Sequence, residues 1–544
     1  MTDTPLPPLP DLADTGAAFW RGGERGELRI GWCPACAAYL HPALAACPRC
    51  LGGDISDVAV SGRGVVVALS ENHQRWLPGC PPPYLLAFVA LEEAPHIRLT
   101  TNIIDCEAGA VSVGTRVEAR FRPCGDVWLP MFAPIVDAAP IDTAPLVPLP
   151  TTAIRPMHGT AKFEDKAAIS GIGMSRIGRR LGASPLALTL EACEAAIADA
   201  GLSRDDIDGI SAYPGSTGLP GLSSGGVRAV EQVLRLRPSW HCGAQETPGQ
   251  AGTVIEAMLA VASGLCRHVL CFTSFAEAAR PAITSASARI SGELAWHLPF
   301  GAASPANWIA LYASHYLARF GASRDMLAEI ALSTRRHAAL NPQAIFTAPL
   351  TRDAYYAARM ISSPFGLYDC DIPCDGAIAV IISAADAAAD LRHPPIRIEA
   401  TGTQLTEVQS WDQGSITHQA NVFGPAAHLW TRTSLRPSDI DVALLYDGFT
   451  FNVVSWLEGL GFCGIGEAKD FLSGGANIAL DGTLPLNPHG GHLSAGRTNG
   501  WGNIHEAVVQ LRGLGGARQV RDAGVAAVSL GGGIPAGCML LRRD

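Results

Sequence analysis

The stretch DIDGISAY, residues 206–213, returns in the second half of the chain as DIDVALLY, residues 439–446. Each copy is an acidic turn followed by a short apolar run that ends in a tyrosine, a pattern that favours a buried β-strand. A helical segment that starts with glycine and a further apolar strand follow each copy, at 249–264 and 269–273 and again at 496–513 and 525–530. The same order of elements twice indicates an internal duplication.

The residues ahead of the first copy continue this alternation of short apolar runs and helical segments. A strand is predicted at 168–172 and a helix at 185–200. Strands separated by helices are typical of α/β proteins with a largely parallel sheet. We therefore predict two βαβ-type halves, 167–395 and 396–544, whose helix N-termini meet at a pseudo-twofold centre suited to negative charge.

Four cysteines near the start of the chain form two closely spaced pairs. Cys33 and Cys36 make one CxxC pair, and Cys47 and Cys50 make the second. A single CxxC pair is also typical of redox sites, but two pairs so close together favour four thiolates around one tetrahedral Zn²⁺. Such a site has no open position for water, so we predict a structural zinc ribbon within residues 1–57.

A run of short alternating segments with turn residues between them follows the ribbon. The predicted strands are 62–70, 84–91, 97–104 and 115–121. Because no helical periodicity intervenes, we expect a small antiparallel β-barrel within 58–136. Residues 137–155 hold four prolines and no periodic apolar face. This composition is typical of an extended connector, so we predict a linker over 137–166.

Composition excludes several classes of protein. The chain has 544 residues, enough for about three to four domains. Forty Lys and Arg against 50 Asp and Glu give a net charge of -10, which argues against nucleic acid as a partner. The N-terminus has no secretory signal pattern, and the apolar tail is interrupted by glycines, so we expect a cytoplasmic protein with no membrane span.

The front of the chain carries a set of short motifs. They are Phe19-Trp20, the four cysteines, Ser61-Gly62-Arg63-Gly64, Pro83-Tyr84 and Val113-Gly114. Together they resemble the DUF35 family, which pairs a zinc ribbon with an OB-fold. The resemblance implies an OB-type barrel and a role as an accessory module of acyl-CoA enzymes.

The duplicated body carries a second set of motifs. They are Arg335-Arg336-His337-Ala338, Asn341-Pro342, Asp375-Gly376-Ala377, Tyr446-Asp447-Gly448-Phe449-Thr450, Gly461-Phe462-Cys463, Asn487-Pro488-His489-Gly490-Gly491 and Gly531-Gly532-Gly533. This set resembles the sterol-carrier-protein-x and lipid-transfer-protein branch of the thiolase superfamily. The resemblance implies a thiolase-like fold, a homodimer and a CoA thioester as substrate.

The chain departs from true thiolases at their catalytic positions. Gly249 stands where the resemblance places the nucleophilic cysteine, Ser529 where it places the second cysteine, and Arg497 where it places a histidine. Covalent acyl transfer through a thiolate is therefore disfavoured. The polar groups that remain are Tyr446, Asp447, His489 and Arg497, and they suit chemistry through an enolate.

The motif with Tyr446 resembles the acyl-CoA aldolases that cleave steroid side chains. The resemblance implies a retro-aldolase that splits a bulky β-hydroxyacyl-CoA, such as one with a steroid or other lipid side chain, into a ketone or aldehyde and a shorter acyl-CoA. Two alternatives stay open: a thiolase-type acyltransferase with an unusual site, and a non-catalytic protein that binds acyl-CoA or lipid.

Each polar residue has an expected role and a plainer alternative. Tyr446 is expected to carry a proton if neighbouring positive charge lowers its pKa from about 10, or else to be a buried strand-end tyrosine. His489 is expected to relay a proton or donate to the thioester oxygen, or else to bond the backbone of a turn. Arg497 is expected to bind the enolate or a CoA phosphate. Asp447 is expected to orient His489 or His492, or else to bond backbone amides.

Overall fold

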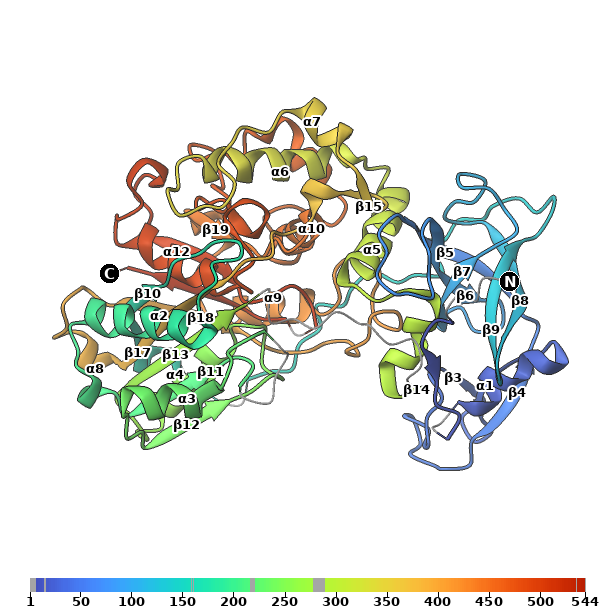
Figure 1. The fold of residues 1–544 in the computed structure, drawn as a ribbon, viewed down its shortest axis with the longest axis horizontal. Helices are drawn as coiled ribbons and strands as arrows, with labels where there is room; N and C mark the ends of the chain where they lie inside the picture. Colours follow the sequence, from blue (N-terminus) through green and yellow to red (C-terminus); the bar gives the residue numbers. More distant parts are fainter. Residues whose placement is uncertain are drawn as a thin grey trace.

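The structure, a computed structural model, describes residues 6–13, 16–157, 159, 161–215, 221–276, 289–534 and 536–543. Figure 1 shows two parts, a large α/β body and, at the far end of the longest axis, a smaller module made by the N-terminal part of the chain. No helix among these residues is both long and apolar enough to cross a membrane.

The body is built on one nine-stranded sheet with the order β12-β11-β13-β17-β10-β18-β21-β20-β19. Its strands are β10 (Ala167–Met174), β11 (Gly209–Ala212), β12 (Trp240–Gly243), β13 (His268–Phe275), β17 (Gly376–Ala384), β18 (Ile396–Gly402), β19 (Val442–Leu444), β20 (Val525–Ser529) and β21 (Cys538–Arg542). Five of its eight strand pairings are antiparallel, so the expectation of a largely parallel sheet is wrong. The prediction failed at the last strand of each half. Strand β17 ends the first half and β21 ends the second, and each pairs antiparallel with both of its neighbours.

The strand order confirms the predicted duplication. The first half runs β11-β13-β17-β10 and the second runs β19-β20-β21-β18, with the same parallel and antiparallel pairings. The two halves join where β10 pairs with β18. The repeated acidic turn has the same role in both halves. Asp208 accepts the backbone N–H of His268 at the start of β13, and Asp441 accepts that of Val525 at the start of β20, each at 2.8 Å.

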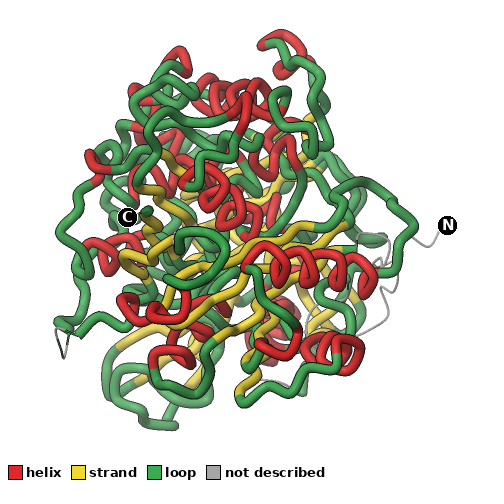
Figure 2. The backbone as a smooth tube through the Cα atoms, turned by 90° about the vertical axis from the view of Figure 1, so that its left-hand side faces the viewer, coloured by secondary structure: helices red, strands yellow, loops and turns green. Residues whose placement is uncertain are grey.

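Helices cover both faces of the sheet, as Figure 2 shows. One apolar layer joins the sheet to α4 (Thr253–Ala262) and α12 (Trp501–Leu511). On the opposite face lie α2 (Pro185–Ala200) and α3 (Gly226–Leu234) in the first half, and α9 (Phe423–Trp430) and α10 (Thr450–Gly459) in the second. Helix α2 starts where its sequence predicts, because the Ser184 hydroxyl caps it and Pro185 occupies its first turn.

The front module consists of a three-stranded ribbon and a barrel. The ribbon strands are β2 (Leu28–Cys33), β3 (Ala38–Leu40) and β4 (Ser56–Val60), and the short helix α1 (Ala17–Gly22) precedes them. The barrel strands are β5 (Arg63–Asn72), β6 (Tyr84–Leu91), β7 (Arg98–Ile103), β8 (Arg116–Cys124) and β9 (Val127–Pro134). Pairing of β5 with β8 closes the barrel. Four barrel strands match the prediction, and β9 was missed.

The body and the module are joined through several contacts. Strand β15 (Met360–Ser362), which pairs with β16 (Phe365–Gly366), also pairs with β5 and so extends the barrel sheet with body residues. Helix α5 (Pro305–Phe320) lies between these regions, whereas α6 (Arg324–Ala338) and α7 (Arg352–Ala357) lie at the top of the body in Figure 1. The Pro-rich segment 137–155 is not a free spacer, since Val147 in it is fully buried and its carbonyl accepts a hydrogen bond from Arg319 of α5.

Candidate active site and metal centre

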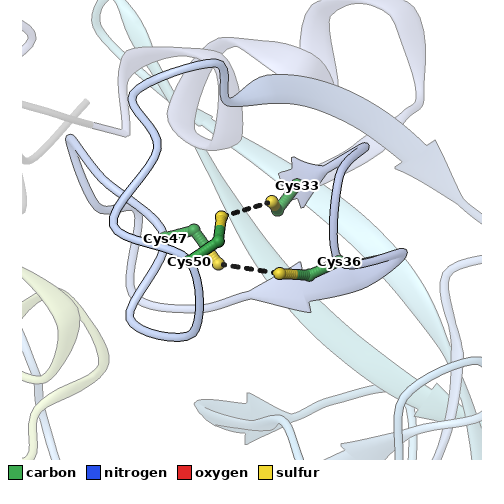
Figure 3. A group of neighbouring side chains, drawn as sticks. All are labelled: Cys33, Cys36, Cys47 and Cys50. Carbon is green, nitrogen blue, oxygen red and sulfur yellow. Dashed lines mark hydrogen bonds between the residues drawn. The ribbon is translucent and has the colours of Figure 1, made fainter.

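The four ribbon cysteines point toward one another from the end of β2, from the turn between β2 and β3, and from the loop between β3 and β4 (Figure 3). Their sulfur atoms all lie within 4.8 Å of one another. The Sγ atoms of Cys33 and Cys50 are 3.7 Å apart, and those of Cys36 and Cys47 are 3.8 Å apart. A tetrahedral Zn²⁺ with bonds of about 2.3 Å requires sulfur separations of about 3.8 Å. The four thiolates therefore fit a closed structural zinc site.

The starts of α4 and α12 meet at the pseudo-twofold centre, as the duplication predicts. The indole N–H of Trp501 donates to the carbonyl of Gln250 at 3.0 Å, and the N–H of Ala251 donates to the carbonyl of Leu530 at 2.9 Å. Gly249 lies in this contact with a φ of +84°, and a β-carbon there would lie 2.7 Å from the Leu530 carbonyl oxygen. The backbone therefore leaves no room for a cysteine at 249. We call the region around these helix starts the seam.

Tyr446 lies at the seam, directly after β19. Its backbone N–H donates to the Ser529 hydroxyl at 2.5 Å. Ser529, which stands where the resemblance places the second cysteine of thiolases, therefore holds the backbone of Tyr446. The ring packs between Gly448 and Gly532, where a β-carbon at either position would lie 2.5 or 2.4 Å from its Cε1. The residue is 9% exposed, and among the described residues its hydroxyl has no hydrogen-bond partner. These contacts hold the ring firmly.

The expected lowering of the Tyr446 pKa is wrong, because the surroundings raise this pKa. Burial raises the pKa of Tyr446 far above its ordinary value, the Asp371 carboxylate raises it further, and Arg497 lowers it by less. Tyr213, the tyrosine of the first copy, adds to the increase, so the duplication brings both tyrosines near the seam. Tyr446 is therefore a neutral phenol at neutral pH.

Asp447 orients His492 rather than His489. One carboxylate oxygen of Asp447 lies 2.7 Å from His492 Nδ1 and also accepts the His492 backbone N–H at 2.8 Å. On the other side of the ring, His492 Nε2 accepts the backbone N–H of Gly500 at 3.1 Å. These bonds place the imidazole proton on Nδ1. The oriented ring packs on Tyr446 with 4.7 Å between ring centroids.

His489 lines a separate small cavity of about 30 Å³. Its carbonyl accepts a hydrogen bond from Asn341, whereas its Nδ1 is buried without a partner in the described part of the chain. Burial lowers the pKa of His489 to about 3, although the nearby Asp447 carboxylate raises it. The imidazole is therefore neutral at neutral pH and is able to accept or donate a hydrogen bond.

Arg497 forms a two-point ion pair with a residue that sequence reasoning missed. Its Nε and Nη2 donate to the two carboxylate oxygens of Asp371 at 2.7 and 2.6 Å. The Asp371 backbone N–H donates in turn to the carbonyl of Gly448, next to the Tyr446 motif. Arg497 stays 26% exposed. The only signal for Asp371 in the sequence is its position four residues ahead of the Asp375-Gly376-Ala377 motif.

Comparison with known proteins gives matches along most of the chain. Residues 20–56 match the family described as "ChsH2, rubredoxin-like zinc ribbon domain", residues 57–122 match "ChsH2, C-terminal OB-fold domain", and residues 402–539 match "Thiolase C-terminal domain-like". The zinc ribbon, the OB-type barrel and the thiolase-like fold predicted from the sequence are thereby confirmed.

The chain is similar over the body to two curated proteins. It is 35% identical to the steroid side-chain-cleaving aldolase of Thermomonospora curvata, over 70% of this chain and 98% of that protein. It is 32% identical to the 17-hydroxy-3-oxo-4-pregnene-20-carboxyl-CoA lyase of Mycobacterium tuberculosis, over 69% of this chain and 99% of that protein. A solved structure titled "Ltp2-ChsH2(DUF35) aldolase" matches with a TM-score of 0.63 and 35% identity, over 70% of this chain and 98% of the other.

Proposed function

The chain belongs to the family of the steroid side-chain-cleaving aldolases, and from this premise we propose that it cleaves a β-hydroxyacyl-CoA by a retro-aldol reaction. The β-hydroxyl loses its proton, the bond between the α- and β-carbons breaks, and its electron pair forms the enolate of the shorter acyl-CoA. The β-carbon becomes a ketone or aldehyde, and the α-carbon of the enolate takes up one proton. The two proton transfers balance, so the reaction needs no co-reactant.

The observation that carries this proposal is the neutral, firmly held Tyr446 with an open hydroxyl. Because burial raises the pKa of Tyr446, a free phenolate is disfavoured. A neutral phenol is still able to give its proton to the enolate α-carbon while it receives the proton of the β-hydroxyl, and it ends the cycle neutral. This exchange requires no thiol, in agreement with glycine at 249 and serine at 529.

The other three residues have supporting roles in this proposal. Arg497 stabilises the negative charge of the enolate oxygen or of a CoA phosphate, and Asp371 fixes the plane of its guanidinium. Asp447 holds His492 against the ring of Tyr446. His489, neutral and with an Nδ1 that has no partner among the described residues, would relay a proton or donate to the thioester oxygen.

We further propose that the acyl group is a steroid or similarly bulky side chain. This rests on the substrate in the name of the Mycobacterium tuberculosis relative, 17-hydroxy-3-oxo-4-pregnene-20-carboxyl-CoA. In that compound the 17-hydroxyl is β to the thioester carbonyl, as a retro-aldol cleavage requires. The ribbon would hold its Zn²⁺ through Cys33, Cys36, Cys47 and Cys50, where the metal supplies folding free energy to the front module.

Incubation with this CoA thioester tests the function. Mass spectrometry is expected to find the steroid ketone and propionyl-CoA in equal amounts, without added CoA and without an acyl-enzyme intermediate. A requirement for free CoA, or an acyl group trapped on the protein, would instead indicate the acyltransferase alternative. Binding without turnover would indicate the non-catalytic alternative.

We also propose that the protein is a cytoplasmic homodimer joined through the thiolase-like bodies. Support comes from β12, which forms one edge of the nine-stranded sheet and has alternate residues exposed. An open edge of this kind is suited to pairing with a second copy. Light scattering at micromolar concentration is expected to give twice the chain mass of 56.9 kDa. A monomer at that concentration would contradict the proposal.

A further inference from the structure

Two buried amide side chains in one short segment have polar atoms without partners among the described residues. Gln419 and Asn421, in the segment between β18 and α9, are 1% and 0% exposed. Among the described residues, Gln419 Nε2 and both amide atoms of Asn421 lack a hydrogen bond. A buried polar group left unpaired costs about 1–3 kcal/mol. Folding alone therefore gives no reason for these two amides.

A fixed neighbour determines which way the Gln419 amide faces. The backbone N–H of Phe449 donates to Asn452 Oδ1 at 2.7 Å, so Asn452 must present its Nδ2 elsewhere. That Nδ2 donates to Gln419 Oε1. Gln419 Nε2 is consequently the atom that faces away as an open donor. Asn452 comes two residues after the Tyr446-Asp447-Gly448-Phe449-Thr450 motif, so one stretch of chain positions both the phenol and this donor.

The Gln419 amide and the Tyr446 ring lie against adjacent residues of one loop, and Asn421 follows two residues after Gln419. The ring of Tyr446 packs against Gly532, and Gln419 Nε2 packs against Gly533, where a β-carbon would lie only 1.7 Å from it. Asn452 Nδ2 also lies 3.5 Å from the carbonyl oxygen of Gly532. Glycine at these two positions is what allows both groups to approach the loop. A ligand would reach both groups if this glycine loop moved aside.

We propose that Gln419 and Asn421 bind the β-hydroxyl of the acyl-CoA, as residues that determine specificity. This rests on the proposed function. Gln419 offers an open donor, and the Asn421 amide offers both a donor and an acceptor. A hydroxyl both donates and accepts hydrogen bonds, whereas a thioester carbonyl only accepts. The amides therefore match the β-hydroxyl before cleavage, and their N–H groups match the ketone oxygen afterwards. Because the amide atoms are buried, the glycine loop must shift for the hydroxyl to reach them.

The test measures binding without turnover. Titration calorimetry with the Tyr446→Phe protein compares 17-hydroxy-3-oxo-4-pregnene-20-carboxyl-CoA with the same compound lacking the 17-hydroxyl. The hydroxylated ligand is expected to bind at least about tenfold more tightly, because a site built for a hydroxyl rejects the analogue without it. Adding Asn421→Gly, which suits the φ of +60° at this position, or Gln419→Met is expected to reduce the preference to less than about threefold.

A matched control separates ligand binding from structure. Gln510 is also a fully buried amide, but its side chain bonds Glu506 and the backbone of Arg518 and Val520. Gln510→Met is expected to lower the melting temperature and leave the ligand preference intact, whereas Gln419→Met is expected to lose the preference with a smaller change in melting temperature.

Three results would overturn the proposal: equal affinity for the two ligands in the Tyr446→Phe protein, a preference that survives both amide variants, or no binding of either ligand. Failure of the proposed function is a separate result. It would appear as absent cleavage by the wild-type protein even though the hydroxyl preference persists and depends on the amides.

Discussion

In the part of the chain that the structure describes, the zinc ribbon and the seam both gather chemically active side chains, and they are assembled in opposite ways. The ribbon takes its four thiolates from residues 33–50, and their spacing alone indicates the metal. The seam joins Gly249, Asp371, Tyr446 and Arg497, which come from widely separated parts of the chain. A local site can be read from the spacing of its residues, whereas a site made of distant segments depends on how the sheet and its loops bring them together.

Cys36→Ser is expected to have the largest effect on structure, and this effect should be confined to the front module that contains the ribbon. Losing one of four ligands opens the zinc site, so the front module should lose its metal and unfold. Elemental analysis is expected to give one zinc per wild-type chain and much less in the variant. A preparation without zinc, or one whose zinc content survives the substitution, would contradict the structural role of these cysteines.

Tyr446→Phe tests the seam without disturbing its packing. Removing a hydroxyl that exchanges protons with the substrate should lower kcat by at least about 10²-fold with little change in KM. Tyr213→Phe, at the same position of the first copy, is the matched control and should change kcat by less than about threefold. Steady-state kinetics on both variants measure the difference. Normal turnover by Tyr446→Phe would remove the phenol from the mechanism.

Gly249→Cys asks whether the thiolase nucleophile can be restored. A φ of +84° and the carbonyl of Leu530 at 2.7 Å from the new β-carbon should destabilise the protein by about 1–3 kcal/mol. No thiolysis activity is expected, because the backbone has no space for a thiol here. Chemical denaturation measures the first effect and a CoA-dependent assay the second. A stable variant that forms an acyl-cysteine would show that the seam has kept the geometry of a thiolase.

Arg497→Lys should lower kcat/KM by about tenfold. The planar guanidinium, which donates two hydrogen bonds to the Asp371 carboxylate, is replaced by a single ammonium group. Asp371→Asn should have a similar effect, since it leaves the guanidinium without its carboxylate. A rate unchanged in both variants would make this ion pair purely structural. Kinetics on the double variant should show less than the product of the two losses if the residues act as a unit.

Cys242→Ala should have the smallest effect, less than about twofold on turnover. Cys242 lies on the edge strand β12, where its thiol contacts Glu256, and burial raises its pKa to about 12. It is therefore a poor nucleophile at neutral pH. If an alkylating reagent abolished activity in the wild-type protein but not in this variant, the view that only the ribbon thiols matter would fail.

Most elements of the fold could be predicted from periodicity, and the errors have identifiable causes. Strand β9 was missed because the prolines at residues 130 and 134 interrupt its pattern. The antiparallel pairings of β17 and β21 could not be predicted, since a buried strand has the same composition in either direction. Asp371 was missed because a single aspartate in a loop has no distinctive spacing.

The sequence by itself determined the zinc ligands, the repeated strand and helix order, and the absence of a thiol at the helix start of α4. These features depend on residue type and on spacing along the chain, which the sequence contains directly. Only the tertiary structure decided the charge state of Tyr446, the choice of His492 as the partner of Asp447, and the pairing of Arg497 with Asp371. The reason is physical: a pKa and a hydrogen-bond partner depend on burial and on distances between residues far apart in the chain, and folding sets both.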